Sequence, residues 1–98
     1  MGAGAKRLES RVISYRTEFK ASAAKSLSTL PPKIQRRIQG VVATLESNPV
    51  PPAATKLTGR DAYRIRVSYY RIIYSIHENV LTVVVVAIGH RREIYRVN

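Results

Sequence analysis

The chain has 98 residues, enough for one folded domain with a single core and too few for two. Hydrophobic residues make up 45% of it, so a folded globular chain is expected rather than a disordered one. The absence of cysteine excludes disulfides and thiolate metal sites and fits a cytoplasmic protein. A net charge of +11 is typical of a nucleic-acid-binding domain, although an anionic membrane or an acidic partner protein fits the same charge.

The first half of the chain predicts one strand and two helices. Residues 1–9 show no signal-peptide pattern, and we expect them to be a flexible start to a single domain over 10–98. Residues 10–19 alternate partially and contain β-branched side chains, which predicts a strand. Residues 21–30 have apolar side chains at helical spacing, and Pro32 is well placed to begin a second helix that ends before Pro49. Its apolar stripe comprises Ile34, Ile38, Val41, Val42 and Leu45.

The second half predicts three strands. The proline-rich residues 48–62 are expected to be an extended connection, followed by strands at 62–67, 70–77 and 80–88. Two-residue loops at Ser68 and Tyr69 and at Glu78 and Asn79 would join them, because asparagine tolerates a left-handed conformation. Residues 80–88 are apolar at nearly every position and predict the central strand. Residues 89–98 are expected to leave the sheet at Gly89.

This order, β-α-α-β-β-β, predicts an α+β fold with two N-terminal helices packed on one face of a small, mostly antiparallel sheet. One sheet face is expected to meet the helices through Ile65, Val67, Tyr70, Ile72 and Tyr74. The other is expected to carry Arg64, Arg66 and Arg71 together with Ile73, Val84, Val86 and Ile88. No element is expected to cover this second face, which therefore resembles a binding surface.

The three arginines are an unusual feature of that surface. A two-residue loop would place Arg66 directly opposite Arg71, with Arg64 two positions along on the same face. Like charges directly opposed on a sheet are destabilising. Guanidinium groups suit bidentate contact with phosphate, so phosphate is the expected neighbour, and a solvated sheet face is the alternative.

Two sequence blocks resemble a known family. The block "KLTG...YRIRV..YRIIY" and the closing "GHRREIY", in this order within residues 10–96, are similar to the RelE/ParE toxin superfamily, above all to its RelE-type mRNA interferases. The resemblance implies a RelE-like fold and a toxin of a type II toxin–antitoxin system. It further implies a metal-independent endoribonuclease without cofactor that cleaves mRNA in the ribosomal A site and inhibits translation in the cytoplasm. The implied partners are a cognate RelB-type antitoxin, the ribosome with its mRNA, and operator DNA only through the antitoxin complex, with no membrane.

The resemblance also implies roles for individual residues. Arg64, Arg71 and Arg91 would clamp the scissile phosphate and stabilise its charge, and Tyr95 would stack on a base of the cut codon. Arg66 falls where the best-known relatives carry a lysine proposed as general base.

Three further residues are expected to bind RNA. They are Lys56, His90 and Arg92. The charged residues Lys33, Arg36 and Arg37 of the second helix are expected to form a solvated face, unless they touch ribosomal RNA.

Arg66 leaves the source of proton transfer open, because an arginine stays charged at neutral pH and is a poor base. Nearby substitutes are Glu93, His90 and His77, of which His90 is favoured by its unperturbed pKa near 6.5. Because Arg66 stands where those relatives carry a lysine, one alternative function is that of a catalytically weak homologue, which would act mainly in antitoxin-bound autoregulation. A ParE-type DNA gyrase inhibitor is another, disfavoured because such chains generally lack the arginine and tyrosine set of "GHRREIY".

Overall fold

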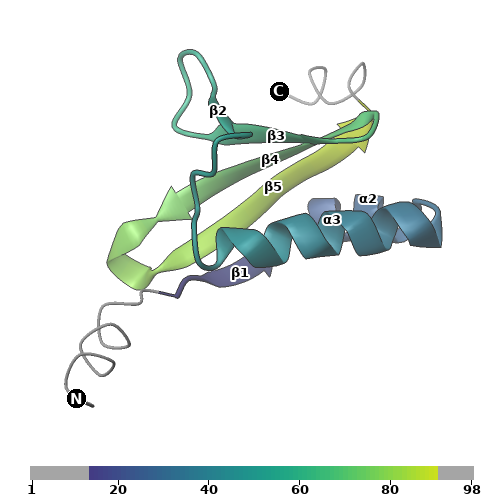
Figure 1. The fold of residues 1–98 in the computed structure, drawn as a ribbon, viewed down its shortest axis with the longest axis horizontal. Coiled ribbons are helices and arrows are strands. Elements are labelled where there is room, and N and C mark those ends of the chain that lie inside the picture. Colours follow the sequence, from purple (N-terminus) through teal and green to yellow (C-terminus); the bar gives the residue numbers. More distant parts are fainter. Residues whose placement is uncertain (1–13, 91–98) are drawn as a thin grey trace, which may run out of the picture.

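A computed structural model of the protein describes residues 14–90. The predicted flexible start lies outside these residues, as do positions 10–13 of the predicted first strand. The described elements, shown in Figure 1, are β1 (Arg16–Phe19), α2 (Ala21–Ser28), α3 (Pro32–Leu45), β2 (Thr55–Lys56), β3 (Tyr63–Val67), β4 (Tyr70–His77), the 3-10 helix η1 (Glu78–Val80) and β5 (Thr82–His90).

The strands form one sheet in the order β1-β5-β4-β3-β2, in which β1 is parallel to β5 and every other neighbouring pair is antiparallel. Both helices lie on one face of this sheet (Figure 1), so the predicted α+β architecture is confirmed. The apolar strand β5 lies inside the sheet between β1 and β4, as its composition predicts. Strand β2 is unexpected, because two residues are too few to show an alternating pattern.

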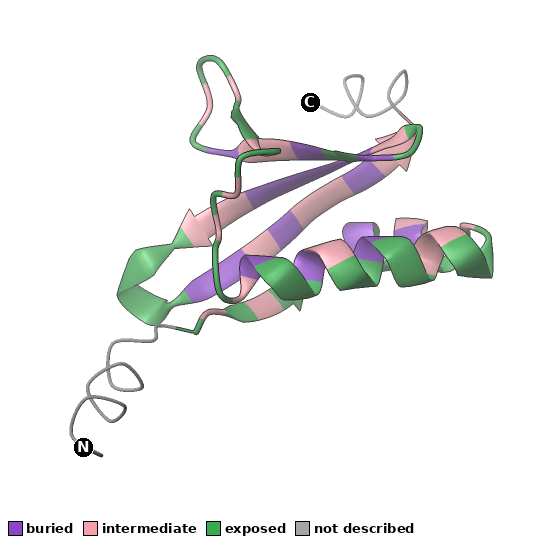
Figure 2. Ribbon diagram, viewed as in Figure 1, coloured by how far each residue is buried: buried purple, intermediate pink, exposed green. Residues whose placement is uncertain are grey.

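The core fills the space between the sheet and the helices. On α3 the predicted stripe supplies the buried Ile38, Val42 and Leu45, and Pro32 is the first helical residue. The sheet supplies apolar side chains from β3, β4 and β5, among them Ile65, Val67, Ile72, Tyr74, Val83, Val85 and Ile88. Figure 2 shows these buried segments recurring along the central strands and along α3.

A β-bulge in β5 corrects two expectations. Tyr74 pairs with Val85 while Ile73 pairs with Ala87, so Val86 is an extra residue in β5. The alternation of side chains shifts there, and Ile88 joins the helix-side core at 5% exposure instead of lying on the arginine-bearing face. Beyond the bulge, β5 continues: Gly89 pairs with Arg71 and does not leave the sheet.

The first of the two tight turns is as expected, and the second is wrong. Ser68 and Tyr69 form a two-residue loop, in which Ser68 has a φ of 57°. The connection from β4 to β5 spans residues 78–81, because His77 pairs with Thr82. The left-handed residue in it is Leu81, with a φ of 48°, and not Asn79.

The sheet face away from the helices is partly covered, contrary to expectation. Ile73 on this face is fully buried and forms a small apolar cluster with Ala62. Leu57 packs against the same cluster, and its backbone N–H donates to the Ala62 carbonyl at 2.9 Å. This bond continues the β2–β3 ladder by one pair, so the buried cluster lies where the β2–β3 hairpin meets β4.

None of the described helices is long and apolar enough to cross a membrane.

Candidate functional site

The register of β3 and β4 brings the three strand arginines together. Arg66 pairs directly with Arg71, and Arg64 pairs with Ile73 two positions along. Directly paired residues share a face, and so do residues two apart on one strand. Arg64, Arg66 and Arg71 therefore lie on one face, which we call the arginine face, opposite the helices.

Arg71 is the buried member of this group. It is 8% exposed, whereas Arg64 is half-buried and Arg66 is exposed. Its Nε and Nη1 atoms are buried and have no hydrogen-bond partner in the part of the chain that the structure describes. Burying unpaired donors of a charged group costs free energy, roughly 1–3 kcal/mol for each lost partner and more for charges. The Arg71 guanidinium therefore favours binding of a hydrogen-bond acceptor that residues 14–90 do not supply.

Gly89 is the residue that faces Arg71 across β4 and β5. It is the β5 residue paired with Arg71, so the row across the sheet reads Arg66, Arg71, Gly89. A glycine inside a strand often marks a place where another group approaches the backbone closely. The sequence pattern gave Gly89 no role in the site, and its one signal is a glycine that interrupts an apolar strand.

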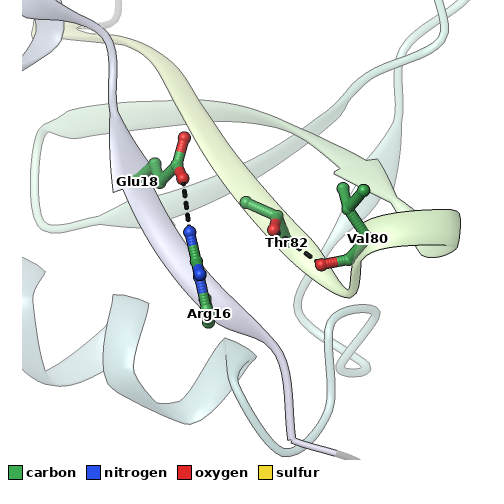
Figure 3. Close-up of polar contacts among 4 residues, drawn as sticks. All are labelled: Arg16, Glu18, Val80 and Thr82. Carbon is green, nitrogen blue, oxygen red and sulfur yellow. Dashed lines mark hydrogen bonds and ion pairs between the residues drawn. The ribbon is translucent and has the colours of Figure 1, made fainter.

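No carboxylate among residues 14–90 pairs with Arg71. The one ion pair within that range joins Arg16 Nη2 to Glu18 Oε2 at 3.0 Å on β1 (Figure 3), and both side chains are more than half exposed. Glu46 instead accepts a hydrogen bond from the Thr17 hydroxyl at 3.1 Å. An anion that neutralises Arg71 must therefore come from beyond these residues.

Lys56 and His90 do not join the arginine face. Lys56 is paired with Tyr63, which faces the helices, and its Nζ donates to the Arg60 carbonyl at 3.3 Å. His90 is paired with Tyr70 on that same helix-side face, with an edge-to-face ring contact at 6.0 Å. The register thus separates both residues from the arginines.

The remaining sequence-predicted residues are elsewhere. His77 is exposed at the far end of β4, where its Nε2 lies 3.0 Å from the Ser75 hydroxyl. Arg91, Arg92, Glu93 and Tyr95 lie outside the described residues.

Tyr74 fixes the connection that leads to the arginine-bearing strand. Its hydroxyl donates to the Pro49 carbonyl at 2.7 Å, and its ring stacks on Tyr63 at 5.8 Å. Burial, and secondarily the neighbouring Tyr63 hydroxyl, raises the pKa of Tyr74 to about 12. This contact ties the chain after α3 to the middle of the sheet.

Arg64, Arg66 and Arg71 are not among the residues that line the main cavities within residues 14–90. A cavity of about 500 Å³ lies at the other end of β4, where Asp61, His77 and Glu78 are among its lining residues. Within residues 14–90 no three His, Cys, Asp or Glu side chains are grouped as metal ligands. An open cationic face suits a macromolecular partner better than a small molecule.

Comparison with known proteins identifies relatives of this fold. The family model described as the ParE toxin of the type II toxin–antitoxin system parDE matches residues 15–95. A sequence search of curated proteins gave no match.

Solved structures give the same picture. A chain of the archaeal RelE–RelB complex from Pyrococcus horikoshii OT3 is 30% identical, with a TM-score of 0.69 over 80% of this chain and 96% of that one. The RelBE2 toxin–antitoxin complex from Mycobacterium tuberculosis matches at 25% identity and a TM-score of 0.73, covering 83% of this chain and 95% of that one. The intact RelBE complex of E. coli matches at 24% identity with a TM-score of 0.71, over 79% and 96% of the two chains, and shows the fold alone. The chain therefore belongs to the ParE toxin family of type II toxin–antitoxin systems, within the RelE/ParE superfamily.

Proposed function

We propose that this toxin is a ribosome-dependent endoribonuclease that cleaves mRNA in the A site and so inhibits translation. The observation that supports it best is the buried guanidinium of Arg71 on the arginine face, whose Nε and Nη1 atoms have no hydrogen-bond partner among residues 14–90. Such a group is preorganised for an anion, and the anion of an RNA backbone is phosphate.

RNA cleavage without a metal requires, above all, electrostatic stabilisation of the charge on the phosphate oxygens. In metal-independent cleavage the neighbouring 2′ oxygen forms a bond to phosphorus, and the bond from phosphorus to the 5′ oxygen breaks. Arg71, with Arg64 beside it on the face, would stabilise the charge that gathers on the phosphate oxygens. By resemblance, Arg91 would complete this clamp and Tyr95 would stack on a base of the codon.

Two protons must also move, one from the 2′-hydroxyl and one to the 5′ oxygen. Arg66 stays charged and acts in this proposal as a further cation. Because His90 lies on the helix-side face, we assign proton transfer to Glu93 or to a ribosomal group.

The relatives suggest the partners. The solved complexes pair RelE with RelB, so we propose a RelB-type antitoxin that blocks this toxin and carries it to operator DNA. Action on ribosomes also implies a cytoplasmic location.

Primer extension on an mRNA held in purified ribosomes tests the proposal, with the same naked mRNA alongside. We expect a cut at the A-site codon only when ribosomes are present. Arg71→Ala should abolish the cut, while Arg16→Ala, which removes an exposed cation of β1, should leave it intact. An uncut mRNA in both tubes, or full cleavage by Arg71→Ala, would overturn the proposal.

A second candidate is inhibition of DNA gyrase, because the family model that matches is that of ParE toxins. A gyrase supercoiling assay distinguishes the two activities. Loss of supercoiling at toxin concentrations that leave ribosome-bound mRNA intact would favour this candidate.

A further inference from the structure

Tyr69, in the β3–β4 turn, is an aromatic residue that the packing of the protein does not use. Within residues 14–90 it has no hydrogen bond and no ring contact, and 70% of it is exposed. The other aromatic residues in that range all pack against the core or contact a second ring: Tyr15, Phe19, Tyr63, Tyr70 and Tyr74. The fold therefore gives Tyr69 no structural role that explains a large aromatic side chain in water.

The turn anchors Tyr69 next to the paired arginines. The last pair of the β3–β4 ladder closes the two-residue loop, and the pair before it is Arg66 with Arg71. Ser68, the first loop residue, has a φ of 57°, whereas the φ of Tyr69 is not positive. A positive φ at the first central residue alone is typical of the tight type II′ hairpin turn. The backbone of Tyr69 is therefore held directly by the two strands that carry the arginines.

The ring of Tyr69 can reach a nucleotide that the arginine pair holds. Tyr69 precedes Arg71 by two positions, so their Cα atoms are at most about 7 Å apart. Figure 2 shows the turn exposed at the end of the sheet. Exposed side chains change rotamer within picoseconds to nanoseconds, so the ring is free to turn toward the arginine face.

A nucleotide matches this combination of groups. A phospholipid headgroup and an acidic peptide both supply anions, but neither joins each anion to a flat ring as a nucleotide does. Single-stranded RNA presents unstacked bases, which lie on aromatic side chains while cations hold the backbone. An exposed tyrosine beside two opposed guanidinium groups therefore favours single-stranded RNA as the partner.

We propose that Tyr69 is a base-stacking residue, which holds the nucleobase next to the phosphate bound by the Arg66–Arg71 pair. Stacking uses a π-face that every base has, so this contact tolerates any base. It is a different contact from the one that the family resemblance implies for Tyr95. The choice of ribosome-bound mRNA as the natural strand rests on the proposed function, whereas the nucleotide chemistry rests on the turn and the arginines.

The test measures binding of the full chain to two oligonucleotides of equal length at low salt. One is 2′-O-methyl RNA, which cannot be cut because its 2′ oxygen carries no proton, and the other is an abasic strand with the same number of phosphates. Tyr69→Ala should bind the RNA at least about fivefold more weakly than wild type and the abasic strand within about twofold of it. The slope of log affinity against log salt should not change, because no phosphate contact is lost.

Two variants serve as controls for this binding measurement. Tyr69→Phe keeps the π-face and should bind the RNA as wild type does. Val80→Ala shortens a side chain that is 60% exposed in the turn at the other end of β4, and it should also leave the affinity unchanged.

A fluorescence measurement reports on the stacking itself. The chain contains no tryptophan, so Tyr69→Trp introduces a single indole at the turn. Its emission should fall when the 2′-O-methyl RNA binds and should stay constant with the abasic strand. Val80→Trp is the matched control, and its emission should respond to neither oligonucleotide.

Three outcomes would overturn the inference. They are equal RNA affinity of wild type and Tyr69→Ala, equal losses of affinity for both oligonucleotides, and a wild-type protein that binds neither strand. The ribosome assay decides the proposed function separately, since A-site cleavage by wild type would leave that function standing in each case. Base-dependent quenching in a protein that cuts no mRNA would leave the inference standing and remove the proposed function.

Discussion

The buried Nε and Nη1 atoms of Arg71 have no acceptor among residues 14–90. Replacing Arg71 by an apolar residue should therefore raise the stability of the protein and lower its activity. Arg71→Met keeps much of the aliphatic length and removes the buried charge with its unpaired donors. We expect the free energy of unfolding, measured in urea, to rise by roughly 1–3 kcal/mol while mRNA cleavage is lost. Arg66→Met, at the exposed partner position, should change stability by less than about 0.5 kcal/mol. A destabilised Arg71→Met would mean that the guanidinium is paired in the free protein.

Tyr74 should make stability depend on alkaline pH. Its pKa is about 12 in the folded protein and near 10 in an unfolded chain, so the unfolded state ionises first. Stability is therefore complete below pH 10 and falls between pH 10 and 12, by roughly 2–3 kcal/mol in total.

Tyr74→Phe removes this dependence together with the bond to the Pro49 carbonyl. The variant should be less stable by about 1 kcal/mol at pH 9 and should lose less stability than wild type between pH 9 and 11.5, both measured in urea. Parallel losses in the two proteins would contradict the assignment, because lysine titration contributes equally to both.

At the scale of the elements, the register of β5 against β4 depends on the β-bulge at Val86. The extra Val86 lies between residues that pair regularly, so its deletion would leave Val85 opposite Tyr74 and bring Ala87 into the next pair without moving any side chain to the other face. We expect the protein lacking Val86 to fold, with a thermal transition lowered by the loss of one half-buried side chain.

Deletion of Val84 is the matched control. It would shift Val83 out of the core and disturb the pairing with β1, so this variant should not show a cooperative transition by circular dichroism. Two variants with the same behaviour would show that the bulge does not set the register.

The bulge also marks how far the sequence could predict this fold. Alternation placed Ile65, Ile72 and Tyr74 on the core side and the arginines opposite, because β3 and β4 are regular. From Val83 to Gly89 every residue of β5 is apolar or small, so an extra residue leaves no trace in the pattern, and Ile88 was placed on the wrong face.

The sequence likewise predicted only part of the candidate site. The local pattern predicted which arginines share a face, since the two-residue loop fixes the register. It could not predict that Arg71 is buried and Arg66 exposed, because burial depends on which distant segments of the chain pack around each side chain. Long-range pairing likewise placed His90 on the helix side, which adjacency to Arg91 in the sequence does not indicate.

For the whole molecule, a net charge of +11 should destabilise the free protein at low salt through self-repulsion. Raising sodium chloride should therefore raise its unfolding temperature by screening.

Phosphate at matched ionic strength should raise the unfolding temperature further than chloride does. An ion that binds the folded state alone stabilises it, by roughly 1.4 kcal/mol when its concentration is ten times its Kd. Phosphate also strengthens burial in general, so the comparison needs a variant without the buried guanidinium. Arg71→Met should keep the chloride effect and lose most of the additional phosphate effect in thermal unfolding. An equal phosphate effect in both proteins would place the bound anion elsewhere.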